Sequence, residues 1–215
     1  MRERISETLG DLAHSEFLVY LMGPYKAFDV AETIRLAEEN DMTTTIPESV
    51  DFGSLVGSDV DLDQDEAVLD LLLDVRDRLR TNPGVNAFLA IDVDIPLEEM
   101  DAGTQSIEFA LASNAIIYLV PKIGDNLGVG IEAGSVLEAI YREGRTSGEK
   151  TSNSYSERVA FVHESGVRSA MIAAVQERWD ARVYSYTDRD DLLRQIRLFV
   201  RDLARREQRG ELPKR

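Results

Sequence analysis

Short apolar runs alternate along the chain with longer segments in which apolar residues recur at helical spacing. Buried strands are predicted at 17–22, 87–93, 115–120, 158–163 and 181–186. Helices are predicted at 30–40, 65–80, 97–113, 131–142, 167–178 and 188–206. Strands that alternate with helices pair in parallel through right-handed crossovers. The pattern therefore predicts a doubly wound α/β fold of the flavodoxin or Rossmann type, with a mostly parallel five-stranded sheet and helices on both faces.

The 215 residues fit one domain, 1–215, because a single hydrophobic core stops growing only beyond roughly 250–300 residues. A helical lead-in is predicted at 1–14, and 208–215 is predicted to be a flexible tail. Polar, Gly-containing stretches at 43–64 and 145–157 are predicted loops or insertions.

Composition excludes several classes of site. The chain has no cysteine and only two histidines, so a disulfide framework, a thiolate zinc site and a multi-histidine metal centre are excluded. No apolar run approaches the ~20 residues of a membrane span, and the N-terminus lacks the apolar region of a secretory signal. We expect a cytoplasmic protein with no membrane partner, no metal and no cofactor.

The charge is strongly acidic, with 40 Asp+Glu against 24 Lys+Arg and a formal net charge of −16. This balance argues against nucleic acid as a partner, because phosphate binding needs a basic face. Only four of the basic residues are lysines, namely Lys26, Lys122, Lys150 and Lys214. Such a composition resembles that of halophilic proteins, so we expect molar salt to stabilise the fold by screening self-repulsion.

Two sets of residues have ordinary structural explanations. The acidic string at 59–66 alternates carboxylates as calcium loops do, but Gln64 stands where an EF-hand needs glycine. It is interpreted as an acidic entry to the following helix, where it favours the helix dipole. His14 and His163 lack a visible catalytic partner and are interpreted as structural.

In doubly wound sheets, ligands bind beyond the carboxyl ends of the strands. A Gly-rich turn follows the third strand, where Gly128 and Gly130 let backbone amides approach phosphate or sugar oxygens, and Glu132 lies in the first turn of the next helix. An ordinary strand-to-helix turn with a dipole-stabilising glutamate is the alternative interpretation. Further candidate binding residues follow or precede the first three strands: Gly23, Pro24, Tyr25, Asp92, Asp94, Asn114 and Asn126.

Three segments resemble the nucleoside 2-deoxyribosyltransferases. Residues 19–25, Val-Tyr-Leu-Met-Gly-Pro-Tyr, resemble the N-terminal signature of that family. Residues 126–134, Asn-Leu-Gly-Val-Gly-Ile-Glu-Ala-Gly, resemble its catalytic segment Asp-x-Gly-x-x-x-Glu-x-Gly, and 112–117 resemble its Ser/Asn-Asp-hydrophobic run. The resemblance extends over the order of elements through about residue 145.

The resemblance implies an enzyme that cleaves the base–sugar bond of a nucleoside or nucleotide, by hydrolysis or by transfer. Glu132 would be the nucleophile at the sugar C1, and Tyr20 would hold its carboxylate. Gly23, Gly128 and the amides near Gly130 would border the sugar or phosphate. Family members lend residues across subunit contacts, so a homodimer or higher homo-oligomer is expected.

The sequence also departs from the family. Asn114 and Asn126 stand where the family has aspartates, and an amide cannot donate a catalytic proton. Asp125, Asp92 or Asp94 would have to substitute. A second hypothesis is therefore a non-catalytic nucleotide-binding or signalling module on the same fold. A response-regulator receiver is disfavoured, because 20–25 has no acidic pair and 184–190 has no lysine.

Overall fold

Five parallel strands form one sheet in the order β2-β1-β3-β4-β5. The computed structural model describes residues 1–10, 16–24, 62–93, 95–123, 133–140, 142, 156–167, 176, 177, 179 and 181–214. The strands are β1 (Leu18–Met22), β2 (Asn86–Phe88), β3 (Ala115–Val120), β4 (Val159–Glu164) and β5 (Arg182–Tyr186). The fold is the doubly wound α/β architecture that the alternating pattern predicts.

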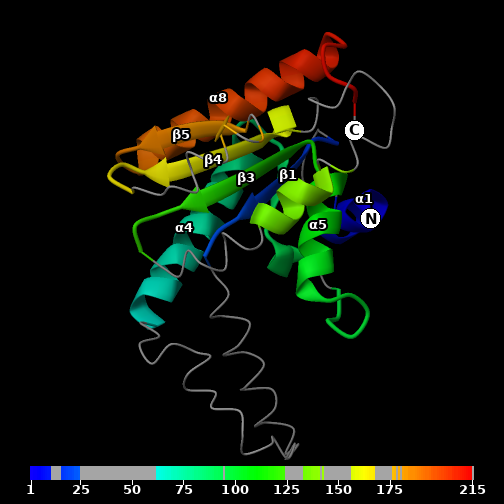
Figure 1. The fold of residues 1–215 in the computed structure, drawn as a ribbon, viewed down its shortest axis with the longest axis horizontal. Helices are drawn as coiled ribbons and strands as arrows, with labels where there is room; N and C mark the ends of the chain where they lie inside the picture. The colour runs from blue at the N-terminus through cyan, green and yellow to red at the C-terminus, as the bar shows by residue number, and fades with distance from the viewer. Residues whose placement is uncertain are drawn as a thin grey trace, which may run out of the picture.

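Helices cover both faces of the sheet (Figure 1). On the first face lie α4 (Leu62–Thr81) and α8 (Arg189–Gln208), whose apolar sides pack in one core cluster. On the second face lie α1 (Arg2–Leu9), α5 (Ala102–Ala112) and the helical segment 133–140. Because both faces are covered, β1 and β3 are buried at every position and read as continuous apolar runs.

Alternation along β1 decides which residues face which layer. Val19 and Leu21 pack in the first core cluster, beneath α4 and α8. Leu18, Tyr20 and Met22 pack in the second, beneath α1, α5 and 133–140. This two-residue period assigns Tyr20 to the second face.

Three elements differ by several residues from their predictions. The helical lead-in predicted at 1–14 ends at Leu9, with Gly10 as its C-cap. The second strand ends at Phe88, and a 3-10 turn, η1 (Ala90–Asp92), replaces its predicted second half. The helix predicted from residue 97 begins at Ala102, because Asp101 caps it by accepting the Thr104 N–H at 3.0 Å. By contrast, β3 has its predicted bounds, and Asp188 caps α8 as expected.

The predicted loop at 43–64 and the predicted flexible tail at 208–215 both need correction. Residues 62–64 belong to α4, which begins at Leu62. In the tail, Leu212 is only 2% exposed and packs in the first core cluster. Several predictions lie outside the described residues: the helix at 30–40, the loop residues 43–61 and 145–155, and most of the helix at 167–178. The second predicted loop ends in a 3-10 turn, η2 (Ser156–Arg158).

Within the described part of the chain, no helix combines the length and the apolar character needed to cross a membrane.

Candidate functional site

The strand order reverses between β1 and β3, where a doubly wound sheet opens its ligand crevice. These two strands pair directly, with Met22 level with Tyr118. Gly23 and Pro24 leave the sheet at the end of β1, and Pro121 follows the end of β3. Of the three segments that carry the family resemblance, 19–25 contains β1 and 126–134 follows β3 in sequence, although about one hundred residues separate these two.

Tyr20 is fully buried, with 0% exposure, on the second face of the sheet. Its ring stacks on Phe88 at 5.1 Å and meets Phe109 edge-on at 5.7 Å between centroids. Ala133 and Val136, from the helical segment that follows Glu132 in sequence, belong to the same cluster. Tyr20 therefore lies under the same layer that holds the start of this helical segment.

Gly23 is close-packed against α4. A Cβ at this position would come within 3.0 Å of both terminal methyl groups of Leu72. Gly23 and Pro24 are both buried. The glycine thus has a packing role on the first face, in addition to the substrate-border role that the resemblance implies.

Asp92 connects α4 to the segment after β2, at the outer edge of the sheet. Its Oδ1 accepts a hydrogen bond from the Arg76 guanidinium at 2.5 Å. Its Oδ2 accepts one from the Leu89 N–H at 2.9 Å and a longer one from the Arg80 guanidinium at 3.4 Å. Burial lowers the pKa of Arg76, but the Asp77 and Asp92 carboxylates outweigh it and hold that pKa above its usual value. Arg76 and Arg80 of α4 and the Leu89 N–H after β2 engage both carboxylate oxygens, so Asp92 links these two elements, and its place in a cleft with Tyr20 stays a prediction.

Asn114 lies at the opposite end of the sheet from the crevice. It directly precedes β3, and its Oδ1 accepts the Leu18 N–H at 2.9 Å, at the start of β1. Parallel strands all begin at one edge and end at the other, so a residue that starts β3 cannot line a cleft at the carboxyl edge. The prediction that Asn114 shares the cleft is wrong.

Asn114 belongs instead to what we term the amino-edge network, made of Arg2, Asn114, Arg158 and Glu207. The Asn114 amide donates to both Glu207 oxygens at 3.0 Å, and the Arg158 guanidinium, which is 1% exposed, donates to Glu207 and to the Asn114 carbonyl. Arg2 donates to Asn114 Oδ1 at 2.9 Å. Sequence reasoning missed this network, because its members come from both ends and the middle of the chain.

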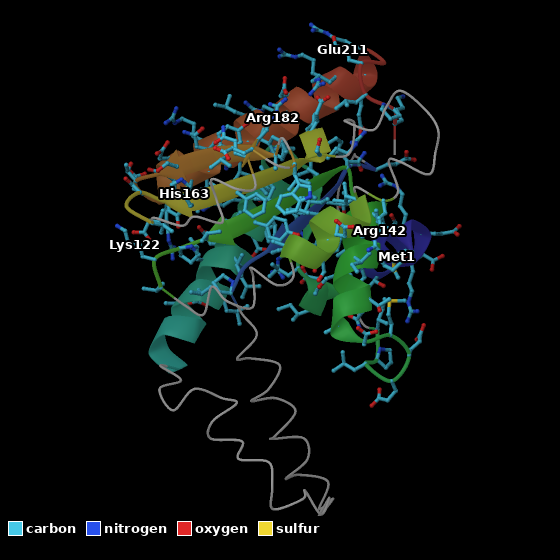
Figure 2. The ribbon with its side chains drawn as sticks, in the orientation of Figure 1. Met1, Lys122, Arg142, His163, Arg182 and Glu211 are labelled. Atoms are coloured by element: carbon cyan, nitrogen blue, oxygen red, sulfur yellow. The ribbon has the colours of Figure 1, made fainter. Side chains whose placement is uncertain are left out.

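A second group that sequence reasoning missed lies at the carboxyl edge, where Figure 2 shows Lys122 and His163 at the same end of the molecule. Glu164 accepts the Lys122 backbone N–H at 3.0 Å, and its other oxygen lies 3.3 Å from Lys122 Nζ. We term this contact the carboxyl-edge pair. His163 Nδ1 lies 3.0 Å from the Glu164 carbonyl oxygen, in line with a structural histidine. The only sequence signal for this group was its position directly after β3 and at the end of β4.

Tyr186, which ends β5, is also buried at this edge. Burial, with a smaller effect from the nearby Glu164 carboxylate, raises its pKa to about 12. Among the described residues, no group of three or more His, Asp or Glu side chains is placed to hold a metal ion.

The remaining predicted site residues lie outside the described residues and stay predictions: Tyr25, Asp94, Asn126, Gly128, Gly130 and Glu132.

Comparison with known proteins leads to one family. No curated protein matches the chain, and no solved structure matches it. A family model matches residues 2–215, which is nearly the whole chain. The protein belongs to the family described as a domain of unknown function, DUF7509.

Proposed function

We propose that this protein binds a nucleoside or nucleotide between the carboxyl ends of β1 and β3 and cleaves its base–sugar bond. The supporting observation is the direct pairing of β1 with β3 at the point where strand order reverses. One segment that resembles the enzyme family, 19–25, contains β1, and another, 126–134, follows β3 in sequence, so we expect both near the edge where such folds bind ligands. The fold alone does not carry the proposal, since one fold hosts many functions.

In the proposed reaction, the Glu132 carboxylate attacks the sugar C1 and forms a glycosyl ester, while the bond from C1 to the base nitrogen breaks. The departing base takes a proton from Asp125, which we assign as the acid because Asn126 has no proton to donate. Water then attacks C1, the bond from C1 to the Glu132 oxygen breaks, and the proton released by the water returns to Asp125, so both carboxyl groups are restored. Tyr20 supports the assignment, because it lies on the sheet face covered by the helical segment after Glu132.

The non-catalytic nucleotide-binding module remains the second candidate function. One of the two observations in its favour has lost its weight. It rested on asparagines at positions 114 and 126, where the family has aspartates. Asn114 is engaged by Glu207 at the amino edge, so its lack of a carboxyl group does not bear on a reaction at the carboxyl edge. Only Asn126 still argues for this module, and catalysis is the better-supported function.

The test is release of free base from a panel of nucleosides and nucleoside 5′-monophosphates in molar salt, followed by chromatography. Glu132→Gln should abolish release by removing the nucleophile, and Asn126→Asp should keep or raise it by restoring a proton donor. Glu138→Gln is the matched control, because Glu138 lies six residues further along and forms an exposed ion pair with Arg142.

Three outcomes are distinguishable. Full activity of Glu132→Gln would reject the assigned nucleophile. Ligand binding detected by calorimetry, with no base release by the unmodified protein, would establish the binding module instead. Neither binding nor release across the panel would reject both candidates.

A further inference from the structure

Helices from both ends of the chain reach the amino edge of the sheet and contact the same side chain there. Helix α1 begins with Arg2, whose guanidinium donates to the Asn114 Oδ1 at 2.9 Å. Helix α8 ends just after Glu207, whose two carboxylate oxygens each accept from the Asn114 amide at 3.0 Å. In Figure 1, α1 and the end of α8 lie on the same side of the molecule. Asn114 thus connects α1 to α8.

The orientation of the Asn114 amide is fixed by contacts on both of its sides. The residue is buried, and its Oδ1 also accepts the Leu18 N–H at 2.9 Å, at the start of β1. An amide oxygen has two acceptor sites, and an amide nitrogen has two donor hydrogens. Arg2 and Leu18 bind the oxygen, whereas Glu207 binds the nitrogen. Because the amide is planar, a rotation that breaks the contacts on one side also breaks those on the other.

The Glu207 carboxylate also balances the buried positive charge at this edge. It accepts from the Arg158 guanidinium at 2.5 Å, and both side chains are buried. Arg158 in turn donates to the Asn114 carbonyl oxygen at 2.9 Å and to the Pro213 carbonyl oxygen at 2.5 Å, beyond the end of α8. Burial lowers the pKa of Arg2, and the charge of Glu207 is the largest of the effects that oppose this. Arg2 therefore responds to the charge of Glu207 as well as to the orientation of Asn114.

We propose that the Asn114 amide couples the two ends of the chain, so that α1 and the last turn of α8, residues 204–208, detach from the sheet together in one local opening. Loss of the Glu207 carboxylate leaves the buried Asn114 N–H groups without this acceptor, which is costly in the protein interior. The amide then turns toward water or another acceptor, and Arg2 loses its contact with Oδ1. Loss of Arg2 acts on Glu207 through the same amide, in the opposite direction.

Such coupling separates the ends of the chain from the centre of the sheet. The strands β1 and β3 are buried at every position and pair directly, so they stay protected while the two ends open. The opening is therefore local and occurs without global unfolding. This inference concerns the conformation of the fold and does not depend on the proposed reaction.

The first experiment is a double-mutant cycle with Arg2→Ala and Glu207→Gln on the full chain, measured by urea unfolding in molar salt. If both act through Asn114, the second substitution costs less once the first is present. The change in the unfolding equilibrium constant of the double variant should fall short of the product of the single changes by about threefold or more. Arg4→Ala with Glu207→Gln is the control cycle, because Arg4 also lies on α1 but pairs with Glu99 on the exposed surface. Its two effects should simply multiply.

Hydrogen exchange read by mass spectrometry locates the opening. Without denaturant, Glu207→Gln should speed exchange about threefold or more both in α1 and at 204–208, while the amides of β3 stay protected. Should Glu207→Gln fail to fold, Arg2→Ala gives the same test, since it should speed exchange at 204–208 whereas Arg4→Ala should not. Multiplying effects in the Arg2 cycle, or faster exchange at one end of the chain with the other end unchanged, would overturn the proposal.

Discussion

The two edges of the sheet carry their charges in different ways. At the amino edge, Arg158 and Glu207 are buried, and each contacts Asn114. At the carboxyl edge, the Lys122 and Glu164 side chains are 52% and 31% exposed, so water reaches both. In Figure 2, Lys122 and His163 mark one end of the molecule, whereas Met1 and Glu211 lie toward the other.

The comparison indicates that the charges at the amino edge stabilise the fold, whereas those at the carboxyl edge contribute little to stability. A buried charge that loses its partner has no solvent to replace it, so the amino edge is suited to holding distant parts of the chain together. Exposed charges exchange partners at little cost, so the contacts at the carboxyl edge can change without unfolding the sheet. Three substitutions test this division, and the first has the largest expected effect.

Glu207→Ala should lower the free energy of unfolding by about 3–5 kcal/mol, because it leaves the Arg158 guanidinium buried without a carboxylate. Urea unfolding in molar salt measures the change. Glu211→Ala is the control, since the Glu211 side chain is 49% exposed and lies 3.7 and 3.8 Å from Arg206 and Arg209, and it should cost less than about 1 kcal/mol. Equal small losses in both variants would show that water replaces the buried carboxylate.

Tyr186 should make the protein less stable in alkali. Its folded pKa of about 12 exceeds the ordinary 10.0, so the unfolded chain releases this proton at lower pH than the folded chain does. The contribution of neutral Tyr186 to the free energy of unfolding is on the order of 2 kcal/mol. It is fully present below pH 10.0 and is lost as the pH rises toward about 12. Tyr186→Phe should flatten this decline in unfolding experiments across that range. Tyr184→Phe, on the same strand, should keep it.

Glu164→Ala should cost less than about 1 kcal/mol, because the carboxyl-edge pair is exposed and water can satisfy the Lys122 N–H. The same change should lower the pKa of Tyr186 slightly, since it removes a carboxylate that disfavours tyrosinate. Ultraviolet titration of tyrosinate measures that shift. A loss comparable to that of Glu207→Ala would abolish the contrast between the two edges.

Part of the site was accessible from sequence because it is encoded locally. The buried run at 17–22 ends at Gly23-Pro24, and the structure has a strand and a chain exit at these positions. Asn114 was misplaced because a motif match shows which residue types recur, and it does not show which edge of the sheet they occupy. The contacts of Asp92 could not be predicted, because its partners Arg76 and Arg80 lie on a helix that only the fold brings beside it.

The sequence by itself determined the alternation of strands and helices, the bounds of β3 and the cap of α8. Each of these depends on residues that lie within a few positions of one another in the chain. The tertiary structure alone decided the strand order, the contacts of Asp92 with the α4 arginines and the amino-edge network. Asn114 and Glu207 are 93 residues apart and meet only after β3 is paired with β1 and α8 is packed on the first face. Hydrophobic period is a property of a short window, whereas the partner of a buried polar group depends on which distant segment reaches it in the folded chain.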